Sequence, residues 1–181
     1  MERRLVELAQ RGDQKAFSEI AFSVSPRLFP VAQRILRDYQ RAEDATQQTL
    51  VQIWRKLPNL SDPDKFDGWA YRILVNTCYA EARKNKRHPD DLRLLETDRA
   101  SADHALSVAD RDMLERAFDR LPAEQRAVLV LQYYLDLGHP QIADMLGVPL
   151  GTVKSRASSG RLALRAALEA DARAGIGGVA R

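Results

Sequence analysis

Hydroxyl-bearing and basic side chains crowd together between residues 152 and 161, and their chemistry is that of binding, not of catalysis. Lysine and arginine attract phosphate groups, and serine and threonine hydroxyls donate hydrogen bonds to acceptor atoms on the edges of bases. A polyanion such as DNA fits this set, and so does plain solvent around the exposed face of a helix. The cluster consists of Thr152, Lys154, Ser155, Arg156, Ser158, Ser159 and Arg161.

A second basic group lies at the end of the patterned part of the first half of the chain. An amide side chain, Asn76, precedes it by about two helical turns. Cations at the C-terminal end of a helix interact favourably with its dipole, which is consistent with a role in solubility alone. The same cations equally suit the phosphates of a nucleic acid. The group consists of Arg83, Lys84, Lys86 and Arg87.

The residue types that enzymes use for catalysis form no recognisable set in this chain. His88, His104 and His139 have no serine, cysteine or paired carboxylates arranged around them in the sequence. Cys78 is the single cysteine, which excludes a disulfide within the chain and leaves no metal-ligand spacing. No phosphate-binding loop or dinucleotide fingerprint occurs. We therefore predict a protein that is not an enzyme and that has no metal site and no cofactor.

The elements that must position these residues are helices, because helical periodicity dominates the chain and predicts an all-α fold. Asp38 is suited to cap a helix that runs to about Lys56. A loop-like stretch follows, and Asp67 is suited to cap the next helix, which holds Trp69 and Ile73 on its apolar side. This second helix carries the basic group at its end.

Charge divides the chain into three parts. Residues 1–87 carry 16 Lys and Arg against 11 Asp and Glu, residues 88–110 carry 2 against 6, and residues 111–181 carry 10 against 8. The acidic middle part has no sustained period and is interpreted as a linker. We therefore predict two small helical domains, 1–87 and 111–170, that are joined by an irregular acidic linker and followed by a flexible tail over 171–181.

The second domain ends in a pattern typical of a helix-turn-helix. Helices are predicted over 111–121, 123–136, 139–146 and 150–168, with a short turn around Gly147 between the last two. The polar cluster then lies near the start of the last helix, on or beside its exposed side, where it could enter a major groove. The apolar faces that close the pair of helices are Ile142, Ala143 and Leu146 against Val153, Ala157, Leu164 and Leu168.

The stretch LGVPLGTVKSR, with LPAEQRAVLVLQYYLDL upstream, resembles the promoter-reading fourth domain of sigma-70-type factors, specifically the extracytoplasmic-function group. The resemblance implies that the last helix reads the minus-35 promoter element. Base-reading positions would be Lys154, Ser155, Ser158 and Ser159, while Arg156 and Arg161 would contact the DNA backbone. Gly160 departs from the family, where alanine is common, at a cost of ~1 kcal/mol for a glycine inside a helix.

The stretch RAEDATQQTLVQIWRKL resembles the second-domain helix by which such factors grip a coiled coil of the largest polymerase subunit. Its polar face would contact the polymerase, although periodicity alone equally fits a face in solvent. Gln48 replaces the glutamate that is usual in the family. The face consists of Glu43, Asp44, Gln47, Gln48, Gln52 and Arg55.

The stretch FDGWAYRILVNTCYAEARKNKR resembles the promoter-melting helix of the same family. Asn76 and the loop over residues 60–68 fall where the family captures the flipped base of the minus-10 element, and the basic group would hold the adjacent phosphates. A base pocket and stacking partners can offset the cost of taking a base out of the duplex. Ala80 stands where the family often has Asp or Asn.

The resemblance spans roughly residues 4–170 and implies a transcription initiation factor that binds core RNA polymerase and directs promoter recognition and opening. Two alternatives remain: a stand-alone helix-turn-helix regulator, and a sigma-like decoy that binds an anti-sigma factor. Core RNA polymerase and promoter DNA are the expected partners, and an anti-sigma factor is a further candidate. The chain has no signal peptide and no run of 18 apolar residues, so we expect a cytoplasmic protein without membrane insertion.

Overall fold

The computed structural model of the chain describes residues 1–87 and 108–177, and the regular structure within those two ranges is entirely helical, which confirms the predicted all-α fold. Side chains are described from Met1 to Lys84, from Asp112 to Asp171 and at Arg173. The N-terminal unit consists of α1 (Arg3–Gln10), α2 (Gln14–Leu36), α3 (Tyr39–Lys56), the 3-10 helices η1 (Leu57–Asn59) and η2 (Pro63–Lys65), and α4 (Phe66–Arg87). The C-terminal unit consists of α5 (Val108–Asp119), α6 (Ala123–Tyr133), α7 (His139–Leu146) and α8 (Leu150–Gly177).

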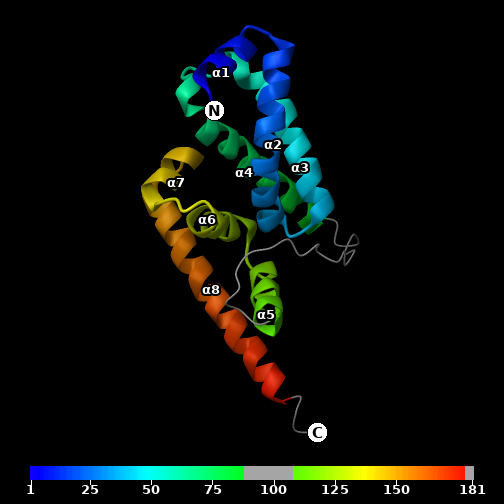
Figure 1. Cartoon of the computed structure of the whole chain (residues 1–181). Helices are drawn as coiled ribbons and strands as arrows, with labels where there is room; N and C mark the ends of the chain where they lie inside the picture. Colours follow the sequence, from blue (N-terminus) through cyan, green and yellow to red (C-terminus); the bar gives the residue numbers. More distant parts are fainter. Residues whose placement is uncertain (88–107, 178–181) are drawn as a thin grey trace.

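Helix α2 is the centre of the N-terminal unit and contacts α1, α3 and α4 (Figure 1). The carboxylate of Asp13 caps it by accepting hydrogen bonds from the backbone N–H groups of Lys15 (2.9 Å) and Ala16 (3.0 Å). Pro26 and Pro30 lie inside the helix, where each lacks an N–H donor, so tertiary packing must stabilise it. The side chains it buries are Ala16, Ile20, Val24, Leu28, Val31, Ala32 and Ile35.

The predicted caps of the next two helices had different outcomes. Asp38 caps α3 as predicted, because its carboxylate accepts a hydrogen bond from the backbone N–H of Arg41 (2.9 Å). The predicted cap at Asp67 is wrong, since α4 begins one residue earlier and Asp67 lies in its first turn. Its carboxylate instead accepts hydrogen bonds from the Met1 ammonium (2.7 Å) and from Arg27 (3.0 Å). Charged groups from distant parts of the sequence thus bind the carboxylate oxygens that a helix cap would have used.

The C-terminal unit follows the predicted order of helices, but its last helix is longer than expected. The periodic pattern placed the end near Leu168, whereas α8 continues to Gly177. Asp171 contributes to this extension because its carboxylate pairs with Arg120 (2.7 Å) and Arg116 (3.6 Å) of α5. The predicted linker over 88–110 lies outside the described residues up to 107, and its last three residues begin α5.

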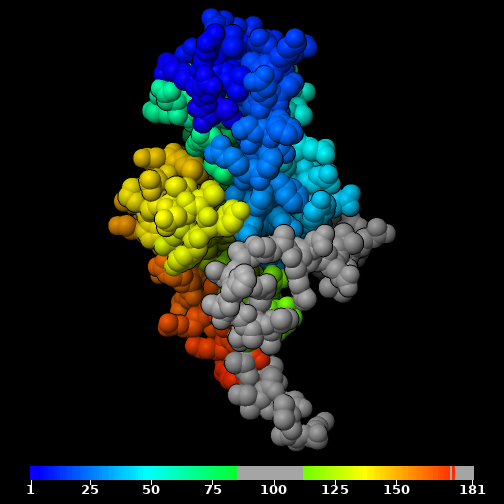
Figure 2. Space-filling model, viewed as in Figure 1, coloured from blue at the N-terminus to red at the C-terminus, as the bar shows by residue number. Residues whose placement is uncertain are grey.

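The two units pack against each other, with α6 against α2 and both α6 and α7 against α4. Figure 2 shows the yellow surface of the C-terminal unit beside the blue surface of α2. Arg126 of α6 is buried at this junction and donates from Nη1 to the backbone oxygen of Ile35 (2.7 Å) and from Nη2 to that of Leu121 (2.8 Å). The contact with Ile35 ties the C-terminal unit to the last turn of α2.

Candidate nucleic-acid and polymerase interfaces

Helices α7 and α8 form the predicted helix-turn-helix, with the turn at Gly147. This glycine has φ +64°, a left-handed conformation that glycine adopts without strain, and its N–H bonds the backbone oxygen of Ala143 (2.8 Å). At the other end of α7, Gln141 accepts a hydrogen bond from the backbone N–H of Gly138 (2.8 Å), so a glycine serves as N-cap. The apolar side chains buried in this pair are Ile142, Ala143, Leu146, Val153 and Ala157.

The predicted minus-35 cluster divides between two sides of α8. Thr152 and Arg156 are only partly exposed, and the charge of Arg156 reaches Tyr79 of α4, where it opposes the upward effect of burial on the tyrosine pKa. The remaining members point to solvent. The exposed members are Lys154, Ser155, Ser158, Ser159 and Arg161.

Gly160 has a packing reason that the sequence did not reveal. It is buried where α6 crosses α8, and a Cβ at this position would lie 3.1 Å from Leu129 Cδ1 and 3.3 Å from Gln125 Cβ. The glycine therefore permits the close approach of the two helices. Its expected cost in helix propensity is offset by tighter packing behind the exposed cluster.

Helix α4 exposes Asn76, Arg83 and Lys84 on the surface of the N-terminal unit. Asn76 and Arg83 are seven residues apart and share one side of the helix. Lys84 pairs with Glu81 (2.6 Å), so part of its charge is already compensated. Lys86 and Arg87 lie in the last turn of α4, and their side chains are outside the described residues.

Beneath this surface lie the buried Cys78 and the partly buried Tyr79 of α4. Burial raises the pKa of the Cys78 thiol to about 12, and the nearby charge of Glu81 acts in the same direction. Burial also raises the pKa of Tyr79 to about 12. Both groups are therefore neutral near pH 7, and neither contributes charge to the surface that α4 exposes.

The polar face of α3 is exposed as predicted for most of its members, with one exception. Gln52 is partly buried, donates a hydrogen bond to Thr77 of α4 (3.1 Å) and accepts one from Lys56 (3.0 Å). It therefore links helices within the unit. The members that are exposed are Glu43, Asp44, Gln47, Gln48 and Arg55.

Two apolar residues on α3 escaped the sequence prediction. Val51 is 50% exposed and Trp54 is 39% exposed, and both lie among the polar residues of the same face. The Trp54 ring packs edge-on against Phe17 of α2, with ring centroids 4.6 Å apart. Their positions off the buried stripe were visible in the sequence, so an apolar residue out of phase with its helix was the available signal.

The loop between α3 and α4 is compact. Pro63 and Phe66 are buried, while Ser61, Asp64 and Lys65 point outward. η1 and η2 form most of its length. The loop therefore presents a short row of polar side chains on an apolar base, next to the start of the helix that carries Asn76.

Two family models match this chain: Sigma-70 region 2 over residues 23–88, and Sigma-70, region 4 over residues 111–164. The RNA polymerase sigma-H factor of Pseudomonas aeruginosa is 30% identical over 93% of this chain and 94% of that protein. The ECF RNA polymerase sigma factor SigM of Mycobacterium tuberculosis is 34% identical over 84% of this chain and 77% of that protein. This chain belongs to the extracytoplasmic-function sigma factors of the sigma-70 family. It is a transcription initiation factor whose partners are core RNA polymerase and promoter DNA.

Two solved structures resemble the sigma factor over most of its length. CnrH, solved in complex with the cytosolic domain of CnrY, matches with a TM-score of 0.64 and 27% identity over 93% of this chain and 97% of that one. RpoE from Bartonella quintana, solved with the anti-sigma factor NepR, matches with a TM-score of 0.64 and 28% identity over 87% of this chain and 99% of that one.

The two units of the sigma factor meet through charged contacts that leave both candidate DNA surfaces partly exposed. Arg37 pairs with Asp119 (2.8 Å) and Glu115 (3.4 Å) of α5, and the guanidinium of Arg34 lies 3.8 Å above the Tyr134 ring. A cavity of about 290 Å³ remains between the units. Its lining includes Arg41 and Arg83 from the N-terminal unit and Arg120, Glu124 and Arg126 from the C-terminal unit.

A further charged contact reaches the helix-turn-helix from the N-terminal unit. The guanidinium of Arg72 on α4 approaches the turn so closely that a Cβ on Gly147 would lie 2.6 Å from it. Within residues 1–87 and 108–177, no group of three or more His, Cys, Asp or Glu residues could hold a metal ion. No helix in the same ranges is long and apolar enough to cross a membrane.

Proposed function

We propose that the sigma factor reads the minus-35 element with α8 and opens the minus-10 element with α4 and the loop before it. The observation that carries this proposal is that two separate helical units each expose a basic surface with hydrogen-bond donors. On α8, Lys154 and Arg161 supply charge, and Ser155 and Ser158 supply hydroxyl donors on the same side of the helix. Thr152 and Ser159 flank this side.

The minus-10 part of the proposal rests on the exposed face of α4. Asn76 would contact the flipped base, and Arg83, Lys84, Lys86 and Arg87 would contact phosphates of the single strand. Exposure of Asn76, Arg83 and Lys84 supports these roles, since a buried amide or cation could not reach DNA.

On α8, Arg156 is the exception among the residues predicted to contact phosphates, because its charge is directed partly toward Tyr79.

The exposed face of α3 is the surface that we propose for core polymerase. Val51 and Trp54 would form its apolar centre, and Glu43, Gln47 and Arg55 belong to the polar surround. This arrangement has the anatomy of protein–protein interfaces, in which a few buried apolar or aromatic anchors are ringed by polar residues. Asp44 and Gln48 complete the surround, whereas Gln52 supports the face from within.

An anti-sigma factor is a further proposed partner. RpoE, which is 28% identical to this chain, was solved with the anti-sigma factor NepR, and CnrH, which is 27% identical, was solved with the cytosolic domain of CnrY. We also propose that the protein has no catalytic activity of its own and acts in the cytoplasm, because its work requires core polymerase on DNA. A stand-alone regulator and a decoy remain the competing functions.

Run-off transcription with purified core polymerase over a random-promoter library tests the proposal against both competitors. We expect transcripts from a defined promoter class only when the sigma factor is present, and weak promoter binding by the sigma factor without core polymerase. Tight binding by the isolated protein would favour the stand-alone regulator. Binding to core polymerase without any transcript would favour the decoy.

A further inference from the structure

The loop that joins α3 to α4 is held from outside by the N-terminal helix. Gln10, the last residue of α1, donates hydrogen bonds from Nε2 to the backbone oxygen of Leu57 (3.1 Å) and to that of Leu60 (2.7 Å). One amide group thus binds two carbonyls of the same turn. Because Gln10 is partly buried, water competes weakly for these carbonyls, and the turn has a fixed shape.

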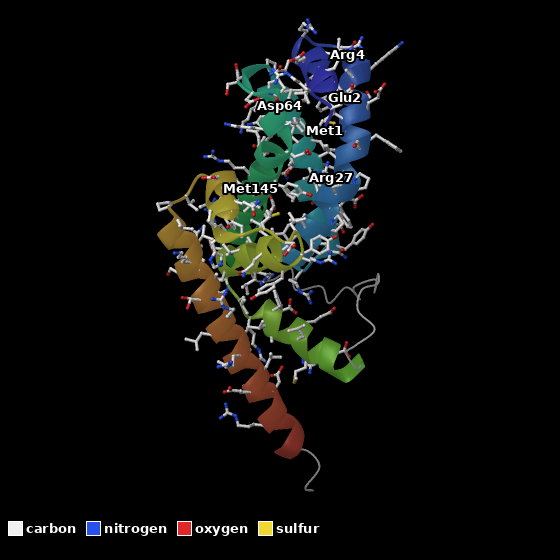
Figure 3. All side chains as sticks on the ribbon, turned by 60° about the vertical axis from the view of Figure 1, so that its left-hand side comes forward. Met1, Glu2, Arg4, Arg27, Asp64 and Met145 are labelled. Carbon is white, nitrogen blue, oxygen red and sulfur yellow. The ribbon has the colours of Figure 1, made fainter. Side chains whose placement is uncertain are left out.

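The other end of the loop is held by two arginines. Arg3 of α1 donates from Nη1 to the carboxylate of Asp64 in η2 (2.5 Å), and Arg27 of α2 donates from Nη1 to that of Asp67 (3.0 Å). Figure 3 labels Asp64 in η2, Arg27 in α2 and Met1 just before α1. Burial acts to raise the pKa of Asp67, but the hydrogen bond from the Met1 ammonium and the charge of Arg27 outweigh it, so the carboxylate remains ionised.

The contacts at the two ends differ in what they can stabilise. The pair Arg3 and Asp64 is exposed on both sides and contributes little, as exposed ion pairs generally do. Gln10 instead donates to the backbone oxygen of Leu60 and gives the backbone oxygen of Leu57 a second donor beside the N–H of Leu60. The pair of Arg27 and Asp67 is also exposed, but Asp67 lies in the first turn of α4 and accepts a second hydrogen bond from the Met1 ammonium. Gln10 therefore has the greatest effect on the loop, and Arg27 has a smaller effect at its junction with α4.

We propose that Gln10 and Arg27 are positioning residues that hold residues 60–68, the end of the loop and the start of α4, in the conformation that receives the flipped minus-10 base. The inference rests on the proposed role of that loop and adds a function for α1, which lies outside the residues matched by the region 2 model. A loop that is ordered before DNA binds avoids the entropy loss of ordering it on binding. Neither residue needs to touch DNA for this effect.

The test compares Gln10→Met, which keeps the length of the side chain but removes the donor, with Gln14→Met on the exposed first turn of α2. Each full-length variant is assembled with core polymerase. The probe is a fluorescent single strand that carries the nontemplate minus-10 sequence of a promoter selected in the run-off library. We expect Gln10→Met to weaken probe binding roughly tenfold, with unchanged affinity for core polymerase, and Gln14→Met to leave both unchanged.

Hydrogen exchange separates a positioning effect from general destabilisation. We expect amides 60–66 to exchange faster in Gln10→Met, while amides in the middle of α3 and α4 keep their protection. Arg27→Gln, with exposed Arg11→Gln as its control, should produce a smaller change of the same kind, because Asp67 keeps the Met1 ammonium. Faster exchange throughout the N-terminal unit, or wild-type binding despite a loosened loop, would overturn the proposal.

A substitution in the proposed base site distinguishes this inference from the function on which it depends. If Asn76→Ala weakens probe binding and Gln10→Met does not, the base site stands and the positioning role is wrong. If neither Asn76→Ala nor Gln10→Met changes binding of the single strand, the proposed minus-10 site itself is wrong, and the positioning role falls with it.

Discussion

The two surfaces that we propose for DNA are positioned by different means. On α8 the exposed cluster belongs to one continuous helix, and the backbone of that helix sets the spacing of its side chains. In the N-terminal unit the surface combines α4 with a loop, and the loop is held by residues 40 to 61 positions away in the sequence. The first surface is a local property of its helix, whereas the second exists only when α1 and α2 are in place.

The two units should therefore respond differently to amino-acid substitutions. A substitution on α8 acts mainly on the contact that its own side chain makes, because the helix remains. A substitution in α1 or α2 can alter a surface that it does not belong to. The junction between the units is a third case, because Arg126 donates hydrogen bonds to backbone oxygens of both units.

We expect the largest effect at the junction, where Arg126 forms one buried link between the units. Arg126→Ala leaves the backbone oxygens of Ile35, Asp119 and Leu121 without their donor. We expect the free energy of unfolding to fall by about 3 kcal/mol or more, since hydrogen bonds from a charged donor contribute about 1.5–3 kcal/mol each. Urea denaturation measures this change. Arg120→Ala removes a half-exposed arginine whose partner Asp171 keeps Arg116, so it should cost less than about 1 kcal/mol; an equal loss in the two variants would contradict the special role of Arg126.

The next largest effect is expected when the basic end of α4 in the N-terminal unit is neutralised. In the variant Arg83→Ala, Lys84→Ala and Arg87→Ala, we expect promoter opening to fall roughly fiftyfold at about 0.15 M salt, if each cation accounts for a salt slope of about −0.7 on single-stranded DNA. Affinity for core polymerase should change little. Permanganate reactivity of unpaired thymines measures opening, and a binding titration measures core affinity. Equal losses in both would mean that this end of α4 contacts the polymerase.

Alkaline pH should weaken the N-terminal unit through Cys78. Its pKa is about 12 in the folded protein and 9.0 when unperturbed, so above pH 9 the unfolded chain releases a proton that the folded chain retains. The stability from the neutral thiol is fully present below pH 9 and is lost as pH rises toward 12, by about 1.4 kcal/mol per pH unit. Urea denaturation between about pH 8 and pH 10 measures the slope, and Cys78→Ala should reduce it. An unchanged slope in that variant would assign the effect to other groups.

The smallest expected effect concerns the packing behind α8. Gly160→Ala gains about 1 kcal/mol of helix propensity, but its Cβ would meet Leu129 Cδ1 at 3.1 Å and push that side chain back. We expect the two effects to nearly cancel, leaving stability within about 1 kcal/mol of the wild type. Gly160→Val adds two methyl groups at the same contact and should destabilise the C-terminal unit by about 1–3 kcal/mol. A valine variant as stable as the alanine variant would show that α6 yields readily at this crossing.

Sequence reasoning found the fold class, the order of helices in the C-terminal unit and the cap at Asp38, because each of these depends on neighbouring residues. It failed where distant groups decide. Asp67 has the composition of a cap, yet Arg27 and the Met1 ammonium hold its carboxylate. Gln52 has the position of a surface residue, yet its amide reaches Thr77. The helix end at Leu168 was misplaced because Asp171 pairs with α5.

The amino-acid sequence alone predicts that this protein is helical, that it consists of two units around an acidic segment, and that it belongs with factors that bind DNA and polymerase. Periodicity, charge and short motifs carry that information, since they act over one or two helical turns. The tertiary structure was needed to see how Gln10 and Arg27 contact the loop and the start of α4, why Gly160 is a glycine, and how Arg126 joins the units. These features depend on groups that the chain brings together from far apart, and their geometry follows from packing that no local pattern records.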